Sequence, residues 1–330
     1  MQKVALIGCG TMGRTHANGY LSIPEAKVVA VCDINAEKAA KLASLHGAKT
    51  YNDYKTMVEN EDIDILDICL PTFLHKQYAV DAMKRGLNVF CEKPIALKVE
   101  DAEEMIMTAK ECNVKFSVGH VVRYFPSYHQ VKEMTEAGRL GSPRLIRTTR
   151  NQGFPGWSWE NWYQDYSRSG GPIVDLVIHD FDWILDTFGD VERVYASSFN
   201  GDVKGQEHCI CILRLKNGAM AHVEGSWAYP QGSIFRMTYE VVGTDAQVEY
   251  DSVSDAPIHL QTNIDGVHHD TFANPMLGLS DPYTAEIRSF ILSVENNRDP
   301  EVTGEQALKA LKVALACVES SKTQKAVVIK

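Results

Sequence analysis

KVALIGCGTMG, residues 3–13, decides the fold, because an apolar strand runs directly into a G-x-G-x-x-G turn. In this pattern Gly8 permits the tight turn, Gly10 lets a pyrophosphate approach the backbone, and Gly13 lets the next helix pack on the sheet. The first turn of that helix supplies free N–H groups and a partial positive charge for phosphate oxygens. The stretch therefore predicts a dinucleotide-binding turn.

The second predicted strand, residues 27–33, ends in Asp33, twenty residues past Gly13. An acid at this position can bind both hydroxyls of the adenine ribose. The same carboxylate repels a ribose 2′-phosphate, and Ile34 and Asn35 bring no cation that could replace the contact. We therefore expect the cofactor to be NAD rather than NADP.

The first 120 residues alternate short apolar strands with helical segments, which is typical of a doubly wound parallel sheet. The expected strands are 3–8, 27–33, 48–51, 63–70, 87–92 and 114–120. Beyond them, strands follow one another at 144–151, 192–199, 208–216, 219–229, 234–243 and 246–251. We predict an α/β fold with an N-terminal NAD-binding Rossmann domain (1–120) and a C-terminal α+β substrate domain (121–330) around an open, mostly antiparallel sheet.

Two further loops leave carboxyl ends of the predicted parallel strands, where open α/β sheets bind their ligands. One is the Pro-Thr-x-x-His loop of residues 71–75, and the other is the Glu-Lys-Pro loop of residues 92–94. Together with the glycine turn they give the predicted cofactor-binding set: Gly8, Gly10, Thr11, Met12, Gly13, Asp33, Pro71, Thr72, His75, Glu92 and Lys93.

These motifs, with the segment GGPIVDLVIHD of residues 170–180, resemble those of the Gfo/Idh/MocA oxidoreductases over essentially the full length. That family includes glucose–fructose oxidoreductase, inositol dehydrogenases and related sugar dehydrogenases. The resemblance implies that Lys93, Asp175 and His179 are the catalytic residues and converge on the substrate. It also implies that the Lys93–Pro94 peptide bond is often cis.

The same three residues suit the oxidation of an alcohol, which removes a hydride from carbon and a proton from oxygen. Asp175 and His179 are four residues apart, so on one helix they would share a face, and the carboxylate could orient the imidazole. A histidine suits the role of general base, and Lys93 could hydrogen-bond the hydroxyl oxygen. The pattern leaves open whether Lys93 or His179 accepts the proton, and an isolated Asp-x-x-x-His also fits a helix cap beside a core histidine.

The substrate is expected to be a cyclic polyol or sugar, with an inositol 2-dehydrogenase-like reaction as the leading case. Trp157 lies in an aromatic stretch, 154–166, that suits either sugar stacking or an ordinary core, and Arg123 follows the sixth strand. The predicted substrate-binding set is Lys93, Arg123, Trp157, Asp175 and His179. The alternatives are another sugar dehydrogenase, such as a glucose or glucoside 3-dehydrogenase, and a non-catalytic NAD-sensing regulator of the same fold.

Bulk properties narrow the partners and the location. A formal charge of −10 disfavours nucleic-acid binding, and no apolar stretch approaches a membrane span. The absence of any C-x-x-C pair and of a signal-like start predicts reduced cysteines and a cytoplasmic protein. We expect no metal, since His268 and His269 fall in a stretch expected to be a loop, and Asp180 and Asp182 would point away from His179. An open sheet in the second domain predicts a homodimer or homotetramer joined through the 192–251 strands.

Overall fold

The computed structural model describes residues 1–200, 205–254, 256–264, 267–273 and 281–329. It divides into two compact units, Met1–Tyr124 with Ser280–Leu308, and Phe125–Leu279 with Lys309–Lys330. Within the described ranges, no helix combines the length and the apolar character needed to cross a bilayer.

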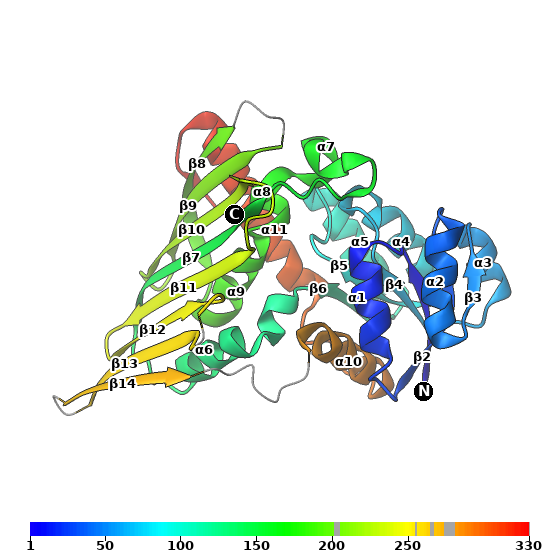
Figure 1. Ribbon diagram of the computed structural model, residues 1–330, viewed down its shortest axis with the longest axis horizontal. Coiled ribbons are helices and arrows are strands. Elements are labelled where there is room, and N and C mark those ends of the chain that lie inside the picture. The colour runs from blue at the N-terminus through cyan, green and yellow to red at the C-terminus, as the bar shows by residue number, and fades with distance from the viewer. Residues whose placement is uncertain (201–204, 255, 265–266, 274–280, 330) are drawn as a thin grey trace. The chain divides into compact units, whose positions relative to one another are not determined.

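The first unit is built on a parallel sheet with the strand order β3-β2-β1-β4-β5-β6. This is the Rossmann order, in which the direction of winding reverses between β1 and β4 and a nucleotide binds beyond the carboxyl ends of the strands. The predicted doubly wound sheet is confirmed (Figure 1). The strands are β1 (Gln2–Ile7), β2 (Ala26–Cys32), β3 (Lys49–Tyr51), β4 (Ile65–Ile68), β5 (Asn88–Glu92) and β6 (Phe116–Gly119).

Local capping sets the ends of several helices in this unit. The Asn35 side chain accepts from the Lys38 N–H at the start of α2, and Gly47 ends that helix in the left-handed conformation. The Asp53 side chain likewise accepts from the Thr56 N–H at the start of α3. Helix α3 was not predicted because its seven residues bury only Met57. The helices are α1 (Thr11–Tyr20), α2 (Ala36–His46), α3 (Tyr54–Asn60), η1 (Thr72–Leu74), α4 (His75–Lys84), α5 (Val99–Glu111), η2 (Val121–Tyr124) and α10 (Pro282–Glu295).

Helix α10 completes the core of the first unit although it lies far along the chain. It packs against α1, and Ile287, Phe290 and Ile291 belong to the same buried cluster as the apolar residues of β1 and β2. The Phe290 and Phe90 rings lie 5.4 Å apart between centroids. The nucleotide-binding sheet is therefore covered partly by a late segment of the sequence.

The second unit contains a nine-stranded sheet of order β14-β13-β12-β11-β7-β10-β9-β8-β15. Its β7–β10 pair is parallel and the other pairs are antiparallel, which confirms the predicted open, mostly antiparallel sheet. The strands are β7 (Pro143–Gly153), β8 (Val191–Asn200), β9 (Glu207–Leu215), β10 (Met220–Tyr229), β11 (Arg236–Gly243), β12 (Ala246–Asp251), β13 (Ile258–Ile264), β14 (Val267–Ala273) and β15 (Val327–Val328).

The expectation that His268 and His269 lie on a loop was wrong. Both residues belong to β14, which forms an antiparallel ladder with β13. The segment carries the polar residues of a loop, and its strand character comes from pairing with β13 rather than from an apolar pattern of its own.

The helices of the second unit gather on one side of its sheet (Figure 1). Strand β9 shows the consequence, because Cys209, Cys211 and Leu213 are buried while the alternating Ile210 and Ile212 are exposed. The helices are α6 (Pro126–Glu136), η3 (Trp159–Gln164), α7 (Tyr166–Ser169), α8 (Gly171–Asp175), α9 (Ile178–Phe188) and α11 (Gly304–Thr323), of which α11 begins in the first unit.

Candidate active site

The glycine turn has the geometry that a bound pyrophosphate requires. Gly8 has φ of +90°, and a Cβ there would lie 2.5 Å from the Cys69 carbonyl oxygen. A Cβ at Gly13 would lie 1.9 Å from the Gly8 oxygen, so the helix needs glycine to approach the turn. Gly10 instead faces open space, with nothing within 4 Å of a Cβ built on it. The turn thus leaves an uncovered backbone at the N-terminus of α1, which fits a phosphate group.

Asp33 is held in place beside this turn. Its Oδ2 accepts from the Cys9 N–H at 2.6 Å, and its Oδ1 accepts from the Asn35 N–H at 2.7 Å. These bonds fix the carboxylate at the carboxyl end of β2, where the ribose hydroxyls of a dinucleotide would lie. The residues present therefore fit NAD.

His75 joins the two loops that follow β4 and β5. The residue opens α4, its ring is fully buried, and its nitrogens lie 2.8 Å from the Pro94 and Leu70 carbonyl oxygens. Burial lowers the pKa of His75. The neighbouring Thr72 is buried as well, in η1, whereas Pro71 is half-buried. In this structure the His75 ring lies between the two loops, and its contact with the cofactor stays a prediction.

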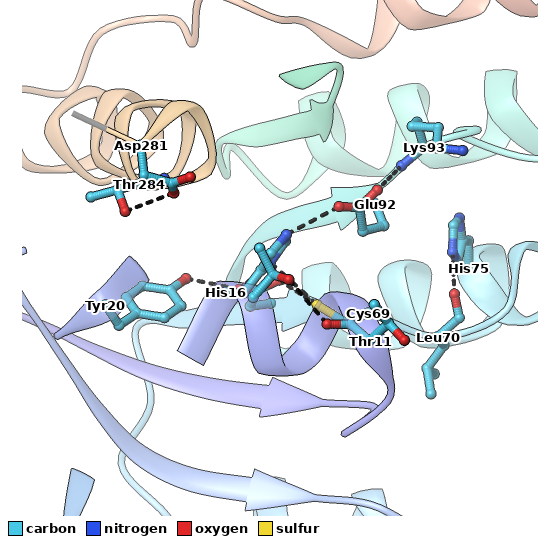
Figure 2. A network of polar contacts seen from close by, with 12 residues as sticks. Thr11, His16, Tyr20, Cys69, Leu70, His75, Glu92, Lys93, Asp281 and Thr284 are labelled. Carbon is cyan, nitrogen blue, oxygen red and sulfur yellow. Dashed lines mark hydrogen bonds and ion pairs between the residues drawn. The ribbon is translucent and has the colours of Figure 1, made fainter. Parts of the chain in front are cut away.

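Glu92 and Lys93 end β5 and begin the second of these loops. Glu92 is buried, Lys93 is half-buried, and the Lys93 N–H donates to Glu92 Oε2 at 3.0 Å. The Lys93–Pro94 peptide bond is cis, as the resemblance implied. Figure 2 shows the Glu92 carboxylate between the Lys93 backbone and the ring of His16.

His16 lies at the centre of a buried polar network on α1, three residues after Gly13. Its Nδ1 lies 3.0 Å from Asp67 Oδ2, and its Nε2 lies 3.0 Å from Glu92 Oε1. The Tyr20 hydroxyl also donates to Asp67, at 3.0 Å, and the Cys69 thiol donates to the other oxygen of Asp67 at 3.5 Å. Figure 2 shows Tyr20, Cys69 and Glu92 arranged around the His16 ring.

The network favours the charged form of His16. Ionised carboxylates only accept hydrogen bonds, so a ring that faces one carboxylate with each nitrogen must donate from both. Burial alone would lower the pKa of His16, but the charge and hydrogen bond of Asp67 outweigh it and raise the pKa well above its usual range. Burial likewise opposes ionisation of Glu92, yet the bond to His16 keeps the pKa of Glu92 below its usual range.

His16, Asp67 and Cys69 also have the spacing of a metal site, with ligand atoms within 4.8 Å of one another. Their hydrogen bonding favours a different interpretation. Burial raises the pKa of the Cys69 thiol, so in this network the sulfur keeps its proton and donates it to Asp67 at 3.5 Å. The Asp67 oxygens are already occupied by Tyr20 and His16. The geometry is that of a hydrogen-bonded ionic network.

Asp175 and His179 lie in the second unit, on two consecutive helices rather than on the single helix expected. The Leu176 and Val177 N–H groups both donate to the Pro172 oxygen, which ends α8, and α9 begins at Ile178 with Val177 as its N-cap. Asp175 is buried and His179 is half-buried.

The neighbouring Asp180 is used elsewhere in the second unit. It forms a buried ion pair with Arg150 at 2.8 Å. Because this carboxylate pairs with a buried arginine of β7, it is part of the core of the unit.

The aromatic stretch 154–166 divides between core and surface. Phe154 and Trp162 are buried, and Trp162 stacks on Tyr163 with centroids 4.1 Å apart. Trp157 is 66% exposed and meets Tyr163 edge-on. In the first unit, Arg123 is half-buried and donates to Gln306 Oε1 at 3.4 Å. Trp157 is therefore available to a ligand, while part of the Arg123 guanidinium supports the fold.

The sequence contained one signal for the His16 network that we had not used. Asp67 lies inside the apolar run IDILDICL (63–70), and a charge in a buried strand needs a partner. His16 is that partner, and it lies 51 positions earlier in the sequence.

Comparison with known proteins gives a consistent result. A profile described as an oxidoreductase family with an NAD-binding Rossmann fold matches residues 2–120, and one described as its C-terminal alpha/beta domain matches residues 132–329. The chain is 30% identical to an uncharacterized oxidoreductase of Bacillus subtilis (strain 168), with 96% of this chain and 93% of the relative covered.

Two further similarities are to proteins named as dehydrogenases. The chain is 28% identical to the Myo-inositol 2-dehydrogenase of Thermotoga maritima, over 98% of each chain. Its fold superposes on levoglucosan dehydrogenase solved with NADH and levoglucosan, with a TM-score of 0.90, 22% identity, and 100% and 99% of the two chains covered. The predicted NAD-binding oxidoreductase is confirmed at the level of family, fold and cofactor.

Proposed function

The chain belongs to the Gfo/Idh/MocA oxidoreductase family, and we propose that it oxidises a secondary hydroxyl of a cyclic polyol to a ketone, as an inositol 2-dehydrogenase does. The similarity to Myo-inositol 2-dehydrogenase over 98% of the chain supports this substrate class. When bound, NAD supplies the acceptor for the hydride.

One observation carries the proposal. The glycine turn, the anchored Asp33 carboxylate and the Lys93 loop all leave the carboxyl edge of one parallel sheet, on either side of its switch point. This arrangement provides a place for a dinucleotide and a cation beside it. A regulator that only senses NAD would have no need of the cation.

We propose separate roles for the residues around the substrate. Lys93 hydrogen-bonds the reacting hydroxyl oxygen and stabilises the negative charge that develops there. His179, oriented by Asp175, accepts the hydroxyl proton. Trp157 and Arg123 contact the substrate ring and its outer hydroxyls. The half-buried state of Lys93 and His179 supports these roles, since each is sheltered but still open to a ligand.

The first experiment is a turnover screen with NAD against inositols, pyranoses and 1,5-anhydro sugars, following NADH absorbance. We expect turnover of at least one inositol, and no turnover of any polyol or sugar would contradict the proposal. A pyranose oxidised in preference to every inositol would move the enzyme to the sugar dehydrogenase alternative.

The second experiment tests the base. His179→Ala should lower kcat by about 10²–10⁴-fold, the usual cost of losing a general base, with NAD affinity nearly unchanged. Lys93→Ala should act similarly. The kcat of the unmodified enzyme should rise with pH through one ionisation, and whichever substitution removes that step identifies the proton acceptor. Unchanged turnover in His179→Ala would show that our assignment is wrong.

Two further expectations belong to the same proposal. We propose a homodimer or homotetramer joined through the exposed face of the second sheet, where Tyr195, Ile210 and Ile212 of neighbouring strands are 38–47% exposed. We also propose that the enzyme works in the cytoplasm, which its eight free cysteines support.

A further inference from the structure

We propose that His16 is a positioning residue for Lys93, acting through the Glu92 carboxylate. This inference rests on the proposed function, in which Lys93 contacts the substrate hydroxyl. It concerns a residue that none of the motifs used above includes.

The connection runs through two hydrogen bonds. His16 Nε2 donates to Glu92 Oε1 at 3.0 Å, and the other oxygen of that carboxylate accepts from the Lys93 N–H at 3.0 Å (Figure 2). A carboxylate that accepts one bond on each oxygen has little freedom to rotate. Through these bonds α1, the helix that follows the glycine turn, fixes the position of the Lys93 backbone nitrogen.

The His16 ring is itself anchored on its far side. Its Nδ1 lies 3.0–3.1 Å from the two oxygens of Asp67, which lies in β4 at 0% exposure. Asp67 in turn accepts from the Tyr20 hydroxyl, one helical turn after His16. The ring thus spans from the central strand of the sheet to the end of β5.

The residue on the other side of Lys93 is also tied to a buried histidine. The Pro94 carbonyl oxygen lies 2.8 Å from His75 Nδ1. Lys93 is therefore flanked by two neighbours, one fixed through its side chain by His16 and the other through its backbone by His75. Its ammonium group is carried by a backbone that is held both before and after it.

Histidine is well suited to this place, because its planar ring donates in two opposite directions when charged. Two buried carboxylates face it, and without a cation between them one would have to take up a proton or leave. Displacement of Glu92 would release the Lys93 N–H. A shift of about 1 Å in a positioned group can cost about 10²-fold in rate.

The test uses two substitutions of His16, each of which can replace one of the two ring nitrogens. The amide of His16→Asn can replace Nδ1 and keep Asp67 satisfied, but it does not reach Glu92. The amide of His16→Gln can replace Nε2 and keep the bond to Glu92. Both substitutions remove the charge of the ring, so a difference between the two variants reports on the link through Glu92 to Lys93. His46→Ala, a half-buried histidine of α2 that bonds the Ala17 carbonyl oxygen, is the matched control.

The first measurement is amide hydrogen exchange at Lys93, which requires no substrate. We expect exchange to become about tenfold faster or more in His16→Asn, and to stay close to the unmodified rate in His16→Gln and His46→Ala. Equal exchange in all four proteins would overturn the proposal. If His16→Asn does not fold, Glu92→Asp takes its place, because the shorter carboxylate cannot reach both His16 and the Lys93 N–H.

The second measurement is kinetic, and it separates a positioning role from a general loss of structure. In His16→Asn, kcat should fall about 10–100-fold, with the Kd for NAD changed less than about threefold. In a Lys93→Ala background the same substitution should cost less than about threefold, because a residue that acts through Lys93 has nothing left to position. An equal loss in both backgrounds would overturn it. If the unmodified protein turns over no polyol or sugar, the proposed function fails, and the exchange at Lys93 alone decides the role of His16.

Discussion

Two glycines of one turn should respond to alanine in different ways. A Cβ at Gly13 would lie 1.9 Å from the Gly8 carbonyl oxygen, so Gly13→Ala should force the helix away from the turn and lower the free energy of unfolding by about 1–3 kcal/mol. Gly10→Ala meets no neighbour within 4 Å and should change that free energy by less than about 0.5 kcal/mol.

For cofactor binding the order should be reversed, with alanine at Gly10 more damaging than alanine at Gly13. The added methyl group at Gly10 would occupy the side from which the pyrophosphate approaches, so NAD affinity should fall at least about tenfold, or about 1.4 kcal/mol. Urea unfolding and NAD titration of both variants check these expectations. A Gly10→Ala protein that binds NAD normally would contradict the assigned phosphate site.

At Asp33 the prediction concerns discrimination between cofactors. Asp33→Asn keeps an acceptor for the Cys9 N–H but removes the charge that binds the ribose hydroxyls and repels a 2′-phosphate. The hydrogen bonds to a charged group contribute about 1.5–3 kcal/mol, so the kcat/KM preference for NAD over NADP should shrink by about tenfold or more. Kinetics with both cofactors measure it, and an unmodified enzyme that uses both equally well would refute the assignment.

At the level of elements, α1, β4 and β5 are joined by the ionic network of His16, and its stability should depend on pH. Because the pKa of His16 is raised on folding, its contribution is fully present below the unfolded value of about 6.5 and is lost as the pH rises through the folded-state pKa. The titratable groups around the ring are Asp67, Cys69 and Glu92, with Tyr20 bonded to Asp67 and the Tyr283 ring of α10 at 6.5 Å between centroids.

The unmodified protein should therefore exceed His16→Asn in free energy of unfolding by more at pH 6 than at pH 9.5. Removing one partner of a buried charge pair costs about 3–5 kcal/mol, which bounds the difference at the lower pH. Urea unfolding at the two pH values provides the comparison. A difference that grew with pH would mean that His16 is neutral in the folded protein.

The elements also show what sequence could and could not predict. The buried strands of the first sheet and the glycine turn follow from local apolar runs and from glycine spacing, and both were predicted. Strands β13 and β14 carry polar residues and form through pairing, so their own pattern did not reveal them. The bond from His16 to Asp67 joins residues 51 positions apart, and it exists because β4 lies next to β1 in the sheet. The helix breaks between Asp175 and His179 because the Leu176 and Val177 N–H groups both donate to the Pro172 oxygen. The spacing of residues in the sequence does not reveal this hydrogen bonding.

At the scale of the whole molecule, the exposed face of the second sheet should decide the assembly state. Ile212 of β9 is 47% exposed and Ile210, two residues earlier, points to the same face. We expect a dimer or tetramer by light scattering at micromolar concentration. Ile212→Lys should shift it towards smaller species, because a lysine ammonium resists burial in an apolar interface.

Leu45→Lys is the matched control, since Leu45 is 48% exposed on α2 of the first unit. It should leave the assembly state unchanged. A monomeric unmodified protein, or equal effects of the two lysines, would contradict assembly through this face.

The path of the chain has a consequence for how the protein is made. The core of the first unit includes Ile287, Phe290 and Ile291 of α10, which leave the ribosome only after most of the second unit has been synthesised. The nucleotide-binding sheet must therefore wait, with the surface that α10 covers still open to water, until translation is nearly finished. A nascent chain halted before α10 would present that apolar surface to chaperones, and binding of NAD to the emerging polypeptide would come late in synthesis rather than early.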